Sequence, residues 1–129
     1  MTKILIIEDE TSVSLLYQRA FNYEGFELIT AFDGLEGLSL AKTHRPNLIL
    51  LDIILPKMNG LKVLEKLKND DKTKNIPVVI LTNLNDMKEI EKAIALGAIK
   101  YITKSQYDPK QVIDIVKKII KQYSVERKV

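Results

Sequence analysis

The sequence predicts one α/β domain in which a five-stranded parallel sheet is covered by helices on both faces. Three observations support this doubly wound arrangement. The chain has 129 residues, a usual length for a single domain. Short apolar or β-branched runs alternate five times with longer segments of helical period. Three of these runs, at residues 4–7, 48–51 and 78–81, are apolar without interruption, as expected of strands buried on both faces.

The remaining elements follow from spacing and from start and stop signals. The other two strands are predicted at residues 26–30 and 99–103, and the helices at 12–24, 33–42, 61–67, 87–94 and 109–120. Asp33, with a glutamate three residues later, is a capping-box pattern, and Asp108 precedes a proline at the first helical position. Gly25 and Gly97 follow two of the helices, where a residue that tolerates positive φ ends a helix well.

Residues that can carry chemistry follow the ends of four predicted strands. They are Glu8, Asp9, Asp52, Thr82 and Lys104. Ligands of such sheets bind outside the carboxyl ends of the strands. Three carboxylates gathered there would raise one another's pKa unless a cation lay between them, and one lysine balances only one of them. Mg²⁺ fits this deficit, since it prefers carboxylate and phosphate oxygens. An aspartate beside Mg²⁺, with a lysine and a threonine nearby, is typical of phosphoryl transfer to a carboxylate nucleophile.

The composition excludes several classes of function. Cysteine is absent, which excludes a disulfide scaffold, a Cys-ligated metal site and a thiol nucleophile. No apolar run approaches the roughly 18 residues of a membrane span, and the run at residues 4–7 is too short for a signal peptide. We therefore expect a cytoplasmic protein.

The net charge of +3 hides an asymmetry along the chain. Residues 1–56 hold four cations and eight acids, whereas residues 57–129 hold sixteen cations and nine acids. A basic half is typical of a surface for nucleic acid or for an acidic partner, and a lysine-rich solvated face is the plainer alternative.

Five stretches of the sequence resemble a known family, the receiver domain of bacterial two-component response regulators. They are residues 6–10, 45–60, 76–82, 97–98 and 101–104. The resemblance covers residues 3 to about 122, and the stretch Pro-Asn-Leu-Ile-Leu-Leu-Asp-Ile-Ile-Leu-Pro-Lys-Met-Asn-Gly is highly specific. It implies a flavodoxin-like three-layer sandwich with sheet order 2-1-3-4-5. We assign residues 1–122 to the receiver domain and expect the polar tail, residues 123–129, to fray.

The resemblance also implies roles for the residues at the sheet edge. Asp52 is the phospho-acceptor, Thr82 and Lys104 contact the phosphoryl group, and the orientation of Tyr101 follows Thr82. The implied Mg²⁺ ligands are Glu8, Asp9, Asp52 and the backbone carbonyl of Ile54. The protein is then a phosphorylation-dependent switch, and not an enzyme beyond catalysing its own phosphorylation and dephosphorylation.

The resemblance also implies the kinds of partner. A histidine kinase or a phosphotransfer protein supplies the phosphoryl group, and a downstream protein target reads the switch. We expect no direct binding to nucleic acid or to a membrane, and a phosphorylation-dependent homodimer is an open alternative. Because the basic half includes the family's usual output face, an acidic protein partner is our hypothesis.

The sequence departs from the family pattern at two positions, and two variable positions beside the site are apolar. Asn83 stands where a small residue is usual. Ser105 stands where proline, often after a cis bond, is usual; a cis bond before serine would cost about 2.5–4 kcal/mol, and the sequence leaves the state of this bond open. Ile54 and Leu84, two residues beyond Asp52 and Thr82, are apolar and cannot orient an attacking water. We therefore predict slow autodephosphorylation.

Other functions are open on the residues alone. One is a receiver-like binding module that is never phosphorylated. Another is a phosphatase of the haloacid-dehalogenase type, but that chemistry needs a second aspartate two residues after the nucleophile, where Ile54 stands. A flavin-binding module needs a phosphate loop after the first strand, and the acidic residues 8–10 would repel a phosphate there.

Overall fold

The computed structural model describes residues 2–127, and the side chains of residues 2–123. It confirms the predicted alternation of strands and helices. The elements are β1 (Lys3–Ile7), α1 (Thr11–Tyr23), β2 (Glu27–Ala31), α2 (Gly34–His44), β3 (Leu48–Leu51), α3 (Gly60–Lys68), β4 (Val78–Thr82), α4 (Met87–Ala95), β5 (Lys100–Thr103) and α5 (Pro109–Arg127). All strand pairs of the sheet are parallel, and the order is β2-β1-β3-β4-β5, as predicted.

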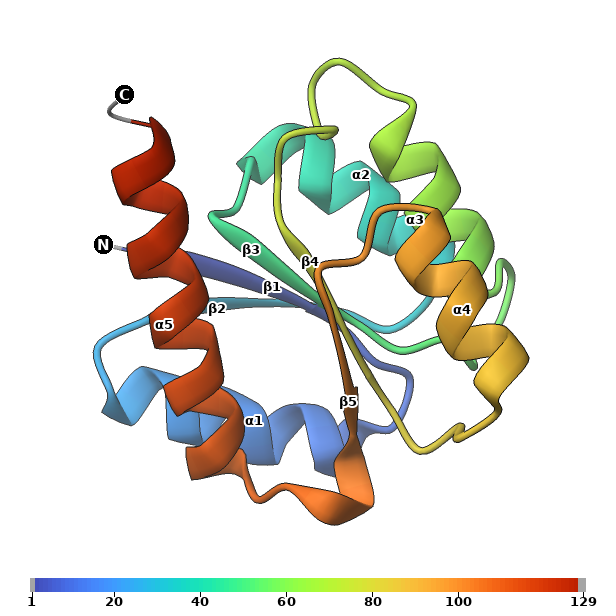
Figure 1. The fold of residues 1–129 in the computed structure, drawn as a ribbon. Coiled ribbons are helices and arrows are strands. Elements are labelled where there is room, and N and C mark those ends of the chain that lie inside the picture. The colour runs from blue at the N-terminus through green and yellow to red at the C-terminus, as the bar shows by residue number, and fades with distance from the viewer. Residues whose placement is uncertain (1, 128–129) are drawn as a thin grey trace.

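The sheet separates two apolar cores. Figure 1 shows α1 and α5 on one face of the sheet, and α2, α3 and α4 on the other. Ile6 belongs to the first core, with Phe21 of α1 and Val116 of α5. Leu5, the neighbouring residue of the same strand, belongs to the second core with Leu64 of α3. The central strands are apolar throughout because successive side chains of a strand enter opposite cores.

The helix ends follow the predicted signals. The side chains of Asp33 and Asp108 each accept a hydrogen bond of 2.8 Å from the backbone amide three residues later. Gly25 and Gly97 have φ angles of +88° and +112°, a region that glycine occupies without steric cost. Helix α2 extends to His44, past the predicted end at residue 42.

Helix α5 extends to Arg127, so the predicted tail begins inside a helix. Residues 128–129 of that tail lie outside the described residues. The domain limit at residue 122 stays a prediction. Within residues 2–127, no helix has the length and the apolar character needed to cross a bilayer.

The register of the sheet brings the functional residues to one edge. Ile7 at the end of β1 pairs with Leu51 at the end of β3, and Thr82 of β4 pairs with Thr103 of β5. The Asp52 amide continues the β1–β3 ladder by donating to the Ile7 carbonyl at 3.1 Å. The residues that follow these strands therefore lie side by side.

Candidate functional site

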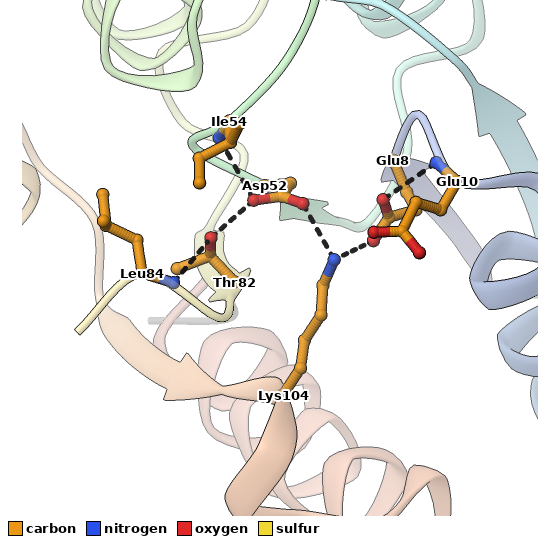
Figure 2. A network of polar contacts seen from close by, with 7 residues as sticks. All are labelled: Glu8, Glu10, Asp52, Ile54, Thr82, Leu84 and Lys104. Carbon is orange, nitrogen blue, oxygen red and sulfur yellow. Dashed lines mark hydrogen bonds and ion pairs between the residues drawn. The ribbon is translucent and has the colours of Figure 1, made fainter.

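Asp52 lies at the centre of the candidate site. Its side chain is buried, with 7% of the residue exposed. One carboxylate oxygen, Oδ1, accepts from the Thr82 hydroxyl at 2.5 Å and from the Ile54 amide at 3.2 Å. The other oxygen accepts from the Lys104 ammonium at 2.8 Å, and Figure 2 shows these contacts. The carboxylate thus lies beside a cation and a hydroxyl, both of which can hold oxygens of an incoming group.

Lys104 reaches Asp52 from the short 3₁₀ helix Lys104–Gln106, which follows β5. The bond to Ser105, whose state the sequence left open, is trans. The ammonium also contacts a carboxylate oxygen of Glu8. Burial by itself would lower the pKa of Lys104, but its hydrogen bonds to Asp52 and Glu8 and the attraction of their charges together outweigh burial and raise that pKa. Lys104 is therefore charged, and it lies between two carboxylates.

The predicted acidic ligands form one cluster. One oxygen each from Glu8, Asp9 and Asp52 lies within 4.8 Å of the others. Asp9 is exposed, whereas Glu8 is buried. Burial raises the pKa of Glu8, and the opposing hydrogen bonds from Lys104 and the Glu10 amide do not cancel this effect. A set of oxygen donors alone suits a hard divalent cation. A role for the Ile54 carbonyl stays a prediction.

A chain of contacts leads from Asp52 to Tyr101 on β5. The Thr82 hydroxyl oxygen, which donates to Asp52, accepts a long hydrogen bond of 3.4 Å from the Leu84 amide. The Leu84 carbonyl in turn accepts from the Tyr101 hydroxyl at 2.5 Å. Burial is the main cause that raises the pKa of Tyr101, so this hydroxyl keeps its proton. The two residues predicted as the switch are therefore connected through the loop after β4.

Two contacts of the site were not predicted from the sequence. Lys104 contacts Glu8 as well as Asp52, and the acceptor for Tyr101 is the backbone carbonyl of Leu84. A backbone carbonyl carries no signal in a residue pattern, and the position of a lysine ammonium depends on four side-chain torsions. The residue types alone could therefore have indicated neither contact.

Comparison with known proteins identifies the family of this chain. The family model of the response regulator receiver domain matches residues 4–117. Sporulation initiation phosphotransferase F of Bacillus subtilis (strain 168) is 35% identical over 118 residues, which are 92% of this chain and 93% of that protein. The alkaline phosphatase synthesis transcriptional regulatory protein PhoP of the same organism is 35% identical over 123 residues. This chain spans about half the length of PhoP and of several other curated relatives.

The solved structures agree with the sequence comparison. The crystal structure of a response regulator receiver domain protein (CheY-like) from Methanospirillum hungatei JF-1 is similar, with a TM-score of 0.91 and 26% identity. The similarity covers 98% of both chains. With the fold, the acidic cluster and the sequence relatives in agreement, this chain belongs to the response regulator receiver domains, the phosphorylation-dependent switches of two-component signalling.

Proposed function

We propose that Asp52 accepts a phosphoryl group from a histidine kinase or a phosphotransfer protein. The observation that carries this proposal is the pairing of both Asp52 oxygens, one with Thr82 and the other with Lys104. A buried carboxylate so placed offers an oxygen nucleophile, with a cation and a hydroxyl beside it for the phosphoryl oxygens. The cytoplasmic location stays a prediction.

The proposed transfer exchanges one bond at phosphorus for another. An oxygen of Asp52 bonds to phosphorus, and the bond between phosphorus and the imidazole nitrogen of the donor breaks. The electron pair of that bond stays on the nitrogen. Lys104 stays charged and balances one phosphoryl charge, and the Thr82 hydroxyl turns to donate to a phosphoryl oxygen.

The acidic cluster fits Mg²⁺, and the proposal includes this ion. The donors of the cluster are oxygens within 4.8 Å of one another. Glu8, Asp9 and Asp52 would hold the ion, together with the backbone carbonyl of Ile54. Bound there, Mg²⁺ would neutralise phosphoryl oxygens during the transfer.

Thr82 and Tyr101 are the proposed switch. A Thr82 hydroxyl that turns from Asp52 to a phosphoryl oxygen alters the position of the Leu84 amide, which donates to it. The Leu84 carbonyl holds the Tyr101 hydroxyl, so the Tyr101 side chain follows the loop. One new dianionic group then biases an element that has two arrangements.

An acidic protein is the proposed downstream partner. A groove of about 540 Å³ between β5 and α5 is lined by Ile99, Ile115 and Ile119, and by Lys100 and Lys118. Among the residues whose side chains the structure describes, no acidic residue lines the groove and neither lysine has an ion pair. An amphipathic peptide with leucines and glutamates at helical spacing should therefore shift the amide resonances of β5 and α5.

Charge reversal tests this partner surface. Lys100→Glu with Lys118→Glu should abolish the shifts caused by the acidic peptide. Lys117→Glu, at a lysine that is paired with Glu24 at 3.3 Å, is the control. Equal binding by all three forms would contradict the proposed surface. Light scattering with and without phosphorylation tests the alternative of a phosphorylation-dependent homodimer.

Intact-mass measurement after incubation with phosphoramidate and Mg²⁺ tests the central proposal. The wild type should gain one phosphoryl group and Asp52→Asn should gain none. Asp71→Asn, at an exposed carboxylate outside the site, should behave as the wild type. No gain in the wild type supports a binding module that is never phosphorylated. Continuous turnover of the phosphodonor without retention supports a phosphatase.

A further inference from the structure

The loop that carries Asp52 is folded back on itself. It joins β3 to α3, and the Gly60 amide at its far end donates to the Ile53 carbonyl at 2.7 Å. A Cβ atom at Gly60 would collide with the Asp52 carbonyl oxygen. The Ile54 amide donates to the Asp52 carboxylate. The backbone path of this loop therefore sets the position of the acceptor carboxylate and of the Ile54 main chain together.

The N-terminus of α2 lies against the middle of the same loop. A Cβ atom at Gly34 would lie 2.5 Å from the Met58 carbonyl oxygen and 2.8 Å from Cγ2 of Val63 in α3. The preceding residue, Asp33, caps α2 with one carboxylate oxygen. Its other oxygen lies 3.6 Å from the Lys57 ammonium. The first turn of α2 thus contacts two consecutive residues of the loop, one through backbone packing and one through charge.

We propose that Gly34, together with Asp33, is a positioning residue for the phosphorylation site. This role rests on the function proposed above for Asp52. The close approach of α2 holds the loop from Asp52 to Gly60 in the path that aims the Asp52 carboxylate and the Ile54 main chain. Lys57 has a φ of +67°, which is uncommon for a residue with a side chain, so the loop needs such support from outside.

The geometry gives the expected size of the effect. A Cβ contact below 3.0 Å requires one of the two groups to move, so a methyl group at residue 34 increases the separation between the start of α2 and the Met58 backbone by about 0.5 Å. A misplacement of about 1 Å can cost on the order of 100-fold in rate. For Gly34→Ala we expect phosphorylation that is about ten-fold slower, and Mg²⁺ binding that is weaker by a similar factor.

A matched pair of variants on α2 tests the proposal. In Gly37→Ala the new Cβ atom would also lie 2.5 Å from its nearest neighbour, but its three nearest atoms all belong to the Ile7 side chain and none to the backbone. Titration of the unphosphorylated proteins with Mg²⁺, followed by amide resonances, measures affinity apart from phosphorylation. Gly34→Ala should bind Mg²⁺ weakly and shift the amides of residues 53–60, while Gly37→Ala should titrate as the wild type.

Two outcomes would overturn the proposal. One is equal Mg²⁺ affinity in Gly34→Ala and the wild type; the other is an equal loss in Gly37→Ala. If circular dichroism shows that Gly34→Ala does not fold, Asp33→Asn replaces it, since asparagine keeps a capping oxygen and loses the charge opposite Lys57. Its Mg²⁺ affinity should fall about two-fold, and no change would overturn the proposal. A wild type that binds Mg²⁺ but accepts no phosphoryl group refutes the function of Asp52 instead.

Discussion

Lys104 compensates two buried carboxylates, and removal of its charge should reduce the stability of the protein sharply. Lys104→Met keeps an apolar side chain of similar length and removes the ammonium. The Glu8 and Asp52 side chains are only 2% and 8% exposed, so water cannot replace the ammonium well. The free energy of unfolding in the absence of Mg²⁺ should therefore fall, because the folded chain alone holds these charges together.

The distance between the charges sets the magnitude. The Lys104 Nζ atom lies 2.8 Å from Oδ2 of Asp52. Two unit charges at this separation attract by about 6 kcal/mol at an effective dielectric constant of about 20. Desolvation of both ions offsets part of this attraction, and loss of one partner of a buried pair usually costs about 3–5 kcal/mol. We expect a loss of about 3 kcal/mol, a large fraction of the usual stability of a domain.

Urea unfolding with and without Mg²⁺ measures this loss. Added Mg²⁺ should restore more stability to Lys104→Met than to the wild type. Mg²⁺ binds the carboxylates of the folded chain only, and in Lys104→Met no ammonium competes with it for them. Lys100→Met is the matched control, since Lys100 is an exposed lysine of β5, and its stability should stay within about 0.5 kcal/mol of the wild type. If Lys104→Met is as stable as Lys100→Met, the ammonium does not compensate the cluster.

Three further predictions concern hydrolysis, the switch and pH. Ile54→Asn with Leu84→Glu supplies groups that can orient water, so the phosphorylated protein should lose its phosphoryl group at least about ten-fold faster; unchanged decay by intact mass would contradict slow autodephosphorylation. Tyr101→Phe removes the bond to the Leu84 carbonyl and should leave the phosphorylation rate unchanged while it reduces the amide shifts that phosphorylation causes in α4 and β5; undiminished shifts would exclude Tyr101 from the switch. Burial lowers the pKa of Lys68 below its usual 10.5, so the unfolded chain keeps a proton that the folded chain loses. Relative to Lys68→Met, the wild type should therefore gain stability as pH rises toward 10.5. A difference in the free energy of unfolding by urea that does not change with pH would contradict this.

The position of the site could be predicted from the sequence because the apolar strands allow little except a parallel sheet. Strands that are apolar on both faces require helices on both faces, and helical crossovers make such strands parallel. Parallel strands end at one edge, so the polar residues after them must meet there. Asp52, Thr82 and Lys104 were therefore expected at one edge, and the structure has Asp52 in contact with the other two. The order of the strands came from the family resemblance, because periodicity alone does not distinguish the neighbours in a sheet.

Contacts made by backbone atoms could not be predicted in this way. Gly34 was part of a predicted helix start, and nothing in the pattern indicated its approach to Met58. The Leu84 carbonyl likewise meets Tyr101 only because of the path of one loop. Such paths depend on tertiary packing between segments far apart in the sequence, whereas residue patterns report mainly the period of a single element.

Leu84 allows two properties of the proposed switch to be tested apart, the lifetime of the phosphorylated state and the movement of Tyr101. Its side chain is the apolar group two residues beyond Thr82 that we predict to slow hydrolysis, while its backbone amide and carbonyl connect Thr82 to Tyr101. Because a substitution changes the side chain and leaves the carbonyl in place, Leu84→Glu should shorten the life of the phosphorylated state and preserve the movement of Tyr101. Tyr101→Phe should do the reverse. A Leu84→Glu protein that hydrolyses faster but also loses the phosphorylation-dependent shifts of β5 would show that the side chain holds the loop in place, and the two properties would then be coupled.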